Sequence, residues 1–358
     1  MVENSVLEKD IESVIADKDL FQELNNSTVL ITGATGLIGS MLVRILHAAN
    51  VRYGLHISVY GQIRNQGKAE LLFGSLFSAK DVNFVSMEQV IAQDIKYNYI
   101  IHTLSPTTSK FFIEHPVETI KASIGSVMDI LEVAKKKSAT VVYLSSMEQY
   151  GIPYEPGQIM TEDKIGMIDH LNVRSSYSES KRLCECLCVS YAKEYGVDVK
   201  IARLAQTFGA GVTLTDNRMP MQFAKAAANG SDIVLHTEGK SISNFVYLTD
   251  AVTGILTILT KGVAGEAYNI CNDKETKSVK EIAELVAERV AGGKIRVKTD
   301  IPENVNLGYA PDTALLLCSA KLRDLGWEAK IKMEEAYKRL SGYIIYCYEG
   351  ESEFCDAD

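Results

Sequence analysis

Hydrophobic and polar positions follow two different periods along most of this chain. Short runs of β-branched and apolar residues predict buried strands, and the stretches between them repeat apolar residues every three to four positions, as amphipathic helices do. The predicted strands span residues 28–32, 56–60, 99–104, 140–146 and 197–204. The clearest predicted helices span residues 117–137 and 176–195. Strands and helices that alternate in this order predict an α/β fold with right-handed crossovers and a doubly wound parallel sheet.

This alternation is absent at the start of the chain and fades in its last third. Apolar residues recur at helical spacing near the start, which predicts a helical extension over residues 1–26 that docks on the rest of the protein. After Phe208, helical patterns at 221–228 and 279–290 and a short strand at 295–299 predict a smaller second lobe.

The two predicted domains are interleaved along the chain. Residues 244–250, followed by an apolar helix, indicate a return to the first domain after the second has begun. We therefore predict a dinucleotide-binding domain from residues 27–207 plus 241–270, a smaller α/β substrate lobe from residues 208–240 plus 271–345, and an acidic tail from residues 346–358.

A glycine-rich turn joins the first predicted strand to the helix after it. Residues 32–39 read TGATGLIG, with glycine at positions 33, 36 and 39. Such glycines allow a tight turn, close approach of the backbone to a pyrophosphate, and close packing of the helix on the strand. The helix N-terminus adds free N–H groups for the phosphates. The turn predicts a dinucleotide site, although an ordinary tight turn also carries such glycines.

Candidate catalytic residues follow two later elements. Tyr177 and Lys181 lie four residues apart, on one face of a predicted helix. A nearby ammonium group lowers the pKa of a phenol, which can then remove a hydroxyl proton while hydride leaves the same carbon. Ser145 and Ser146 end the strand 140–146, at the edge where open α/β sheets bind ligands. The alternatives are a solvated Tyr–Lys pair and serines that only cap the strand end.

The chain resembles the extended short-chain dehydrogenase/reductase family of NAD-dependent epimerases and dehydratases, which mostly modify nucleotide-activated sugars. The resemblance covers nearly the whole chain and rests on TGATGLIG (32–39), YIIH (99–102), SSMEQYG (145–151), RSSYSESK (174–181), ARLAQTFG (202–209) and NFVYLTDAV (244–252). It implies a Rossmann fold and a catalytic trio of Ser146, Tyr177 and Lys181, with Lys181 also holding the nicotinamide ribose. The other implied cofactor-binding residues are Gly33, Gly36, Gly39, Thr35, Leu37, Ile38, Arg64, Thr103, Ser105 and Ser145, and the implied substrate-binding residues are Gln206 and Arg218.

Glu148 distinguishes between branches of this family. The resemblance places glutamate at this position in sugar 4,6-dehydratases and in UDP-glucuronate decarboxylases, whereas 4-epimerases usually have a small residue. A carboxylate beside C5 could remove the hydrogen that a 4-keto group has acidified, before water leaves C6. A glutamate that points into solvent or caps the next turn is the alternative. Met147 departs from the aspartate acid of dTDP-glucose dehydratases, although GDP-mannose dehydratases use a hydroxyl residue there.

We therefore predict an NAD(P)-dependent nucleotide-sugar dehydratase that acts by transient oxidation at C4 and return of the hydride. The alternatives are a nucleotide-sugar 4-epimerase or related decarboxylase, a one-way NADP-dependent carbonyl reductase, and a non-catalytic relative that binds a dinucleotide only as a scaffold or sensor.

Two departures affect the expected diphosphate site. Relatives often carry arginine where Ser243 stands, and a second arginine where this chain reads TALLL (313–317). Arginine suits phosphate because its planar fork binds two oxygens. Arg218 and Lys240 are candidates to replace them. A decarboxylase would be affected most, because its resemblance relies on the second arginine too.

The second strand leads into a segment that bears on the cofactor. NAD enzymes usually end this strand with an acid that binds the ribose 2′-hydroxyl. Here the segment reads VYGQIRNQ (59–66), with Arg64 and no acid, which resembles the VxGxxR pattern of NADP-holding GDP-mannose dehydratases. A surface arginine without a cofactor role is the alternative. We predict tightly bound NAD or NADP, with NADP slightly favoured by Arg64.

Composition narrows the classes of molecule that this chain is expected to bind. The 358 residues include 37 Lys and Arg against 46 Asp and Glu, a net charge of −9, with no basic stripe for nucleic acid and no apolar run long enough for a membrane. The seven cysteines form no metal-type pair, so we predict no metal site and a reduced, cytoplasmic setting. The expected partners are a small-molecule substrate and a second copy of the chain. An apolar stripe that would suit a homodimer contact, or packing on the protein's own sheet, comprises Leu183, Cys184, Leu187 and Cys188.

Overall fold

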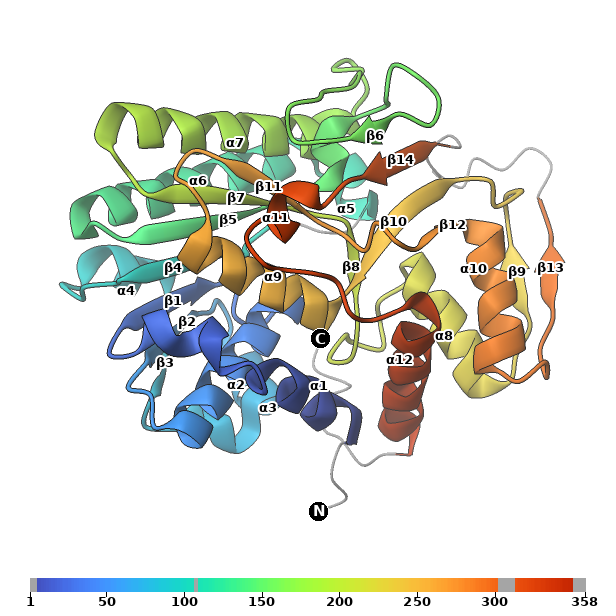
Figure 1. Cartoon of the computed structure of the whole chain (residues 1–358), viewed down its shortest axis with the longest axis horizontal. Helices are drawn as coiled ribbons and strands as arrows, with labels where there is room; N and C mark the ends of the chain where they lie inside the picture. Colours follow the sequence, from blue (N-terminus) through green and yellow to red (C-terminus); the bar gives the residue numbers. More distant parts are fainter. Residues whose placement is uncertain (1–4, 106–108, 302–312, 350–358) are drawn as a thin grey trace.

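The computed structural model describes residues 5–105, 109–301 and 313–349, which form a larger and a smaller lobe (Figure 1). The larger lobe contains a seven-stranded sheet in the order β11-β7-β5-β4-β1-β2-β3, and every neighbouring pair of strands is parallel. Its strands are β1 (Thr28–Thr32), β2 (Ser58–Gln62), β3 (Val82–Val85), β4 (Tyr99–His102), β5 (Thr140–Ser146), β7 (Val199–Leu204) and β11 (Ala267–Ile270). The predicted doubly wound parallel sheet is therefore confirmed.

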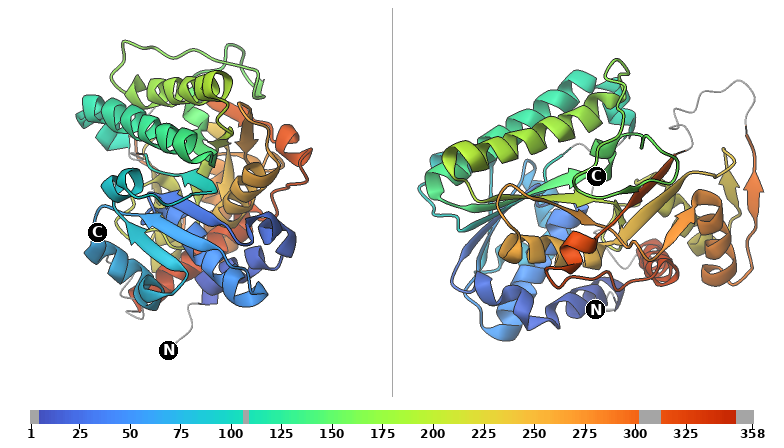
Figure 2. Two further views of the ribbon diagram at one scale, coloured as in Figure 1. Left: turned by 90° about the vertical axis from the view of Figure 1, so that its left-hand side faces the viewer. Right: turned by 45° about the horizontal axis from the view of Figure 1, so that its top comes forward.

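Helices cover both faces of this sheet. The helices around it are α1 (Ser5–Ile15), α2 (Leu37–Tyr53), α3 (Gln66–Phe73), α4 (Met87–Ala92), α5 (Ser109–Glu114), α6 (Pro116–Lys137), α7 (Ser175–Tyr195) and α9 (Leu248–Lys261). One hydrophobic core joins α2 and α9 to one face, and a second joins α6 and α7 to the other. Helices α6 and α7 lie side by side in both views of Figure 2. Burial on both faces explains why the strands read as nearly continuous apolar runs.

The strand order reverses beside β1, whose neighbours are β4 on one side and β2 on the other. In open α/β sheets, ligands bind at the carboxyl ends of the strands next to such a reversal. The glycine turn follows β1, and Ser146 ends β5, two strands away. The sheet topology therefore brings the predicted cofactor and catalytic segments to one edge.

The smaller lobe has its own sheets and core. Its strands are β6 (Ile159–Met160), β8 (Gln206–Phe208), β9 (Ile233–Leu235), β10 (Ile242–Tyr247), β12 (Thr276–Ser278), β13 (Val297–Thr299) and β14 (Ala314–Leu317). Its helices are α8 (Met219–Asn229), α10 (Val279–Leu285) and α12 (Met333–Tyr348), and a π-helix spans Val286–Val290, whereas the short helix α11 (Ala320–Arg323) contacts β11 of the large sheet. Strand β10 is central, because it pairs with β8, β12 and β14.

The chain crosses between the lobes within the segment 241–270. We had assigned this whole segment to the dinucleotide-binding domain, but β10 belongs to the smaller lobe's sheet, and only α9 and β11 join the large sheet. The apolar pattern of β10 reports burial and does not reveal its pairing partner. Helix α12 continues to Tyr348, so the first residues of the predicted tail are helical, whereas 350–358 lie outside the described residues.

The N-terminal extension connects the two lobes. Helix α1 is followed by a 3₁₀ helix, Lys18–Leu24, and contacts α2, α9 and α12. Asp10 on α1 is fully buried and accepts hydrogen bonds from the Tyr247 hydroxyl of β10 at 2.6 Å and from Arg339 of α12 at 2.7 Å. Burial raises the pKa of Asp10, and the two donors partly offset this.

The stripe that we expected at a dimer contact is divided in the structure. Cys184 and Cys188 are fully buried in the core between α6, α7 and the sheet, whereas the Leu183 side chain is 46% exposed. Within the described ranges, five cysteines are free thiols and Cys347 is disulfide-bonded. None of the helices in the described ranges combines the length and apolar character that crossing a membrane requires.

Candidate active site

The glycine turn forms a close backbone cradle at the end of β1. Gly33 has a φ of +65°, and a Cβ there would lie 3.0 Å from the Thr103 Oγ1 atom. A Cβ at Gly39 would press against the Gly33 carbonyl oxygen, so α2 packs closely on the turn. Gly36 precedes α2, and no side chain caps this helix end. The uncapped N-terminus fits a pyrophosphate, as the family resemblance implies.

The remaining residues predicted to contact the cofactor lie around this turn. Thr35, Leu37 and Ile38 are half-buried at the start of α2. The Thr103 hydroxyl donates to the Thr32 carbonyl oxygen at 2.7 Å, and thus links β4 to the turn. Arg64 is exposed, two residues beyond β2, which leaves its guanidinium free to meet a 2′-phosphate.

Ser146, Glu148 and Tyr177 converge at the end of β5. Ser146 ends β5 and caps the short 3₁₀ helix Met147–Tyr150, because its Oγ accepts the Glu148 N–H at 3.2 Å. Tyr177 lies in the first turn of α7 and stacks on Phe112, with ring centroids 4.2 Å apart. The side chains of Ser146 and Glu148 both influence the titration of the Tyr177 phenol. The structure therefore brings together the three groups predicted to act on the sugar.

The pKa of Tyr177 differs from our expectation. Burial raises this pKa well above the usual value, and the carboxylate of Glu148 raises it further, whereas the hydroxyls of Ser146 and Ser105 act in the opposite direction. We had expected Lys181 to lower it. Lys181 instead donates from Nζ to the Leu144 carbonyl oxygen at 2.8 Å and lies 5.6 Å from the Tyr177 ring centroid. Desolvation of the phenol thus outweighs the helical spacing that suggested a lowered pKa.

Lys181 is fully enclosed by protein. Burial lowers the pKa of its ammonium group to about 8. Lys181 lies one turn beyond Tyr177, so it can reach a nicotinamide ribose placed at the end of β5, as the family resemblance implies.

Ser145 belongs to a separate, closed polar network. Its Oγ donates to Glu185 at 2.5 Å, and Glu185 forms an ion pair with Arg203 at 2.7 Å. Arg203 also donates to the Tyr150 hydroxyl at 2.8 Å and to the Glu162 carbonyl oxygen at 2.9 Å. The Ser145 hydroxyl is therefore occupied with fixing α7 to the sheet, although we predicted contact with the cofactor.

Unlike Glu185 and Arg203, Glu148 and Arg174 are not joined in an ion pair within the described part of the chain. Burial raises the pKa of the Glu148 carboxyl, and the positive charge of Arg174 only partly offsets this. Arg174 immediately precedes α7, and its Nη1 atom is inaccessible to solvent and has no hydrogen-bond partner. Sequence reasoning did not single out this residue, although its position one turn before Tyr177 was a usable signal. It also missed Phe112, which stacks on Tyr177.

The predicted substrate residues come from the smaller lobe. Arg218 precedes α8, and its charge lowers the pKa of Tyr177, which places it near the site; it is half-exposed and pairs with Asp216 at 2.7 Å. Gln206 is exposed at the start of β8. Lys240 is exposed and pairs with Glu238. Ser243 lies in β10 and pairs with Leu315 of β14, so TALLL is a sheet strand here. Arg218 is therefore better placed than Lys240 to meet substrate.

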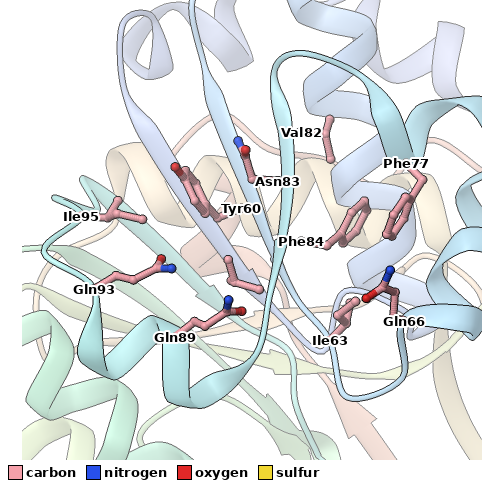
Figure 3. A pocket seen from close by; sticks show the side chains of 11 residues that line it. Tyr60, Ile63, Gln66, Phe77, Val82, Asn83, Phe84, Gln89, Gln93 and Ile95 are labelled. Carbon is pink, nitrogen blue, oxygen red and sulfur yellow. The ribbon is translucent and has the colours of Figure 1, made fainter.

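A hollow of about 570 Å³ lies elsewhere, along the β3 edge of the large sheet (Figure 3). Tyr60, Phe84, Gln89 and Gln93 are among its lining residues, and none of the predicted catalytic residues is. It is therefore separate from the site around Tyr177. Within the described ranges, no cluster of three His, Cys, Asp or Glu side chains could hold a metal ion.

Comparison with known proteins identifies the relationships of this chain. The sequence model described as "NAD dependent epimerase/dehydratase family" matches residues 29–271. Two curated relatives are UDP-glucuronic acid decarboxylase 1 of Xenopus tropicalis, 26% identical over 94% of this chain and 81% of its own length, and UDP-glucuronic acid decarboxylase 6 of Arabidopsis thaliana, 28% identical over 90% of both.

Solved structures share the fold. UDP-glucose 4-epimerase from Thermotoga maritima aligns over 90% of this chain and 99% of its own, with a TM-score of 0.75 and 20% identity. A dTDP-glucose 4,6-dehydratase from Bacillus anthracis in complex with NAD covers 91% and 98%, with a TM-score of 0.72 and 19% identity. RMD from Pseudomonas aeruginosa, complexed with NADPH, covers 90% and 100%, with a TM-score of 0.70 and 19% identity.

Proposed function

This chain belongs to the NAD dependent epimerase/dehydratase family, and on that premise we propose that it transforms the sugar of a nucleotide sugar through a 4-keto intermediate, with Glu148 acting at C5. The enzyme is thus a nicotinamide-dependent one that modifies nucleotide sugars. The observation that carries the proposed reaction is the convergence of Ser146, Glu148 and Tyr177 at one edge of the sheet.

The residues divide the first step between them. Tyr177 accepts the proton of the sugar C4 hydroxyl, and Ser146 shares a hydrogen bond with the same oxygen. Bound oxidised nicotinamide would accept the hydride from C4 and return it later, and its positive charge would favour the phenolate. Lys181 orients the ribose. The product of this step is a 4-keto sugar, which acidifies the hydrogen at C5.

Dehydration is the reaction that the glutamate motif predicts. Glu148 would remove the C5 proton, the electron pair would form a C5–C6 double bond, and the C6 hydroxyl would leave as water after gaining a proton. The returned hydride and a proton would then saturate C6 and C5. Met147 is the buried residue where dTDP-glucose dehydratases have an acid, so in this chain the leaving hydroxyl needs another proton donor.

Decarboxylation is a second candidate, favoured by the names of the curated relatives and by Met147. Here a carboxylate at C5 is β to the 4-keto group. The C5–C6 bond would break, its electron pair would pass to the enolate, and carbon dioxide would leave without an acid at position 147. Glu148 would then protonate C5, and the hydride would return to C4. Burial raises the pKa of Glu148, which favours a carboxyl that holds this proton.

Product analysis separates these reactions. We would incubate the purified enzyme with UDP-glucose and with UDP-glucuronic acid, and identify products by mass spectrometry and NMR. Loss of water from the first or loss of carbon dioxide from the second would support Glu148-dependent chemistry, provided that Glu148→Gln abolishes it. Inversion at C4 without mass change, unaffected by Glu148→Gln, would instead indicate a 4-epimerase. Net consumption of NADPH would indicate a one-way reductase.

The cofactor is proposed to be tightly bound NADP, with NAD as the alternative. Arg64 is exposed beside the turn after β2, where a 2′-phosphate would lie. Denaturing the purified protein and identifying the released nucleotide tests this directly. An Arg64→Ser variant should shift preference from NADP toward NAD, and an unchanged preference would remove Arg64 from the site.

We also propose a homodimer formed through α6 and α7. Val117, Ile120, Leu183 and Val189 lie exposed on these two helices, so an apolar surface remains even though Cys184 and Cys188 are buried. A monomer in sedimentation equilibrium at micromolar concentration would contradict this. We also propose a cytoplasmic setting, which cell fractionation would test; the five free thiols fit a reducing compartment, whereas the disulfide at Cys347 argues against one.

A further inference from the structure

Lys181 carries a buried charge that no carboxylate neutralises by direct contact. Its side chain is enclosed by protein, and within the described ranges it forms no ion pair. Its Nζ atom donates one hydrogen bond, to the Leu144 carbonyl oxygen at 2.8 Å. An ammonium group has three donors and is costly to bury without compensation, so other groups must stabilise this charge.

Glu185 supplies only part of that stabilisation. Burial lowers the pKa of Lys181, and the negative charge of Glu185, one turn further along α7, acts in the opposite direction without restoring the usual value. Glu185 is already paired with Arg203 at 2.7 Å, and it accepts from the Ser145 hydroxyl at 2.5 Å. Its carboxylate therefore serves the scaffold first.

Two tyrosine rings face the ammonium group. The Lys181 Nζ atom lies over the Tyr143 ring, 4.9 Å from its centroid, and over the Tyr177 ring, 5.6 Å from its centroid. The negative face of an aromatic ring attracts a cation within about 6 Å, most strongly where water is excluded. Tyr143 is the nearer of the two rings and is buried. It is therefore well placed to stabilise the ammonium charge.

The Tyr143 ring is held in place by its surroundings. Tyr143 lies in β5 and packs in the core that α6 and α7 form with the sheet. His102 of β4 stacks on the ring, with centroids 6.0 Å apart. Burial, together with the charge of Lys181, lowers the pKa of His102 to about 3, so the imidazole stays neutral and adds no second positive charge. Packing thus keeps the ring where it meets the ammonium group.

We propose that Tyr143 is a positioning residue, whose ring face keeps Lys181 charged and in place for the nicotinamide ribose. This inference rests on the proposed function, because Lys181 must hold that ribose. Tyr143 acts only through Lys181, since its own side chain is buried in the core. The Tyr177 ring cannot provide a constant field, because its phenol loses and regains a proton in the proposed reaction.

The titratable groups that face Lys181 come from β4, β5 and α7. They are His102, Tyr143, Tyr177, Cys184, Glu185 and Cys188. Burial raises the pKa of both phenols and of both thiols, His102 is neutral, and Glu185 is paired with Arg203. A transition near about pH 8 in this part of the site therefore reports Lys181.

The pH dependence of cofactor affinity tests the proposal. The full chain, freed of retained nucleotide, would be titrated with NADPH and with NADH between about pH 6 and 9.5. The wild type should bind its preferred nucleotide more weakly above about pH 8, where Lys181 loses its charge. Tyr143→Leu removes the ring, so this transition should move down by about one pH unit, as expected for loss of a buried cation–π contact. Affinity should then be about 5-fold weaker than that of the wild type at about pH 8 and within about 2-fold of it at about pH 6.

Matched variants separate loss of the ring face from general damage. Tyr143→Phe keeps the ring and should leave the transition within about 0.3 pH units of the wild type. Phenylalanines that carry one, two or three ring fluorines, placed at position 143, keep the ring while weakening its negative face, so the transition should fall stepwise along this series. A merely structural defect, such as a cavity in Tyr143→Leu, would weaken binding equally at every pH. The fluorinated series also decides the matter if Tyr143→Leu does not fold.

The outcomes distinguish this inference from the function on which it rests. A wild-type transition near about pH 8 that stays in place in Tyr143→Leu and along the fluorinated series would overturn the role of Tyr143 alone. A wild-type affinity that is constant up to about pH 9.5 would overturn that role together with the ribose-binding role of Lys181. The proposed reaction is tested separately, by the products formed from UDP-glucose and UDP-glucuronic acid.

Discussion

Two arginine and glutamate pairs flank the end of β5, one buried and one half-buried, and they differ in whether the pair is closed. Arg203 and Glu185 are joined directly, and their remaining groups bond to Ser145 and Tyr150. Arg174 influences the titration of Glu148, yet no ion pair joins them within the described part of the chain, and the Arg174 Nη1 atom has no hydrogen-bond partner there. A closed pair stabilises the scaffold, whereas an open pair keeps its binding capacity for a ligand. This contrast locates the chemistry more sharply than burial or charge alone.

The largest expected effect comes from neutralising the open pair's carboxylate. Glu148→Gln should lower kcat about 10²- to 10⁴-fold, the usual range for loss of a general acid or base. Steady-state kinetics on the accepted nucleotide sugar measure this. Glu155→Gln, which changes an exposed carboxylate in the loop before α7, is the matched control and should retain full activity. Full turnover by Glu148→Gln would show that Glu148 has no chemical role.

Breaking the closed pair should affect stability instead. Arg203→Met leaves the Glu185 carboxylate buried and unpaired, so the free energy of unfolding should fall by about 3–5 kcal/mol. Urea denaturation followed by circular dichroism measures this. A Glu185→Leu and Arg203→Met double variant should recover most of the loss, because it removes both charges. A loss below about 1 kcal/mol in the single variant would argue against a structural role for the pair.

Lys181 provides a pH-dependent comparison with the arginines around it. Burial lowers the pKa of Lys181 to about 8, whereas for Arg203 the hydrogen bonds and charge of Glu185 outweigh burial and raise the pKa. Lys181 is protonated below that pKa and loses its charge above it. Affinity for the nicotinamide cofactor should therefore fall as the pH rises above about 8, as measured by fluorescence titration. An affinity that stays constant up to about pH 9.5 would exclude a role for the ammonium group.

The smallest expected effect is that of Arg174→Gln on the free energy of unfolding, and it tests most directly whether the two pairs differ. Arg174→Gln removes no hydrogen bond or ion pair within the described part of the chain, so the free energy of unfolding should change by less than about 1 kcal/mol. The same urea experiment measures it beside Arg203→Met. A loss as large as that of Arg203→Met would mean that Arg174 stabilises the fold directly, which contradicts the open-pair interpretation.

Much of the fold was accessible from sequence because it depends on local patterns. The strand runs and helical periods correctly predicted β1, β2, β4, β5 and β7 and the helices α2, α6 and α7, but they missed β3 and the shorter helices α3, α4 and α5. The assignment of β10 to the first domain was wrong in its pairing. A strand's apolar pattern shows that its faces are buried, but the identity of its neighbours depends on distant segments.

The candidate site likewise combines features that local sequence predicts with features that depend on distant segments. The glycine turn and the spacing of Tyr177 and Lys181 could be recognised because they depend on residues close in sequence. The raised pKa of Tyr177 could not, since it follows from Phe112, Glu148 and other groups that the fold places around the phenol. Ser145 was predicted to face the cofactor, yet its hydroxyl is held by Glu185, forty positions along the chain.

The sequence by itself determined the family, the parallel sheet and the cofactor turn, because backbone conformation and helical spacing are set by neighbouring residues. Only the tertiary structure decided which charged groups are satisfied. Ion pairing and desolvation depend on segments that meet in space, as Glu185 meets Arg203 while Arg174 stays apart from Glu148. That difference, which no local pattern encodes, separates the scaffold of this enzyme from the place where we expect its substrate.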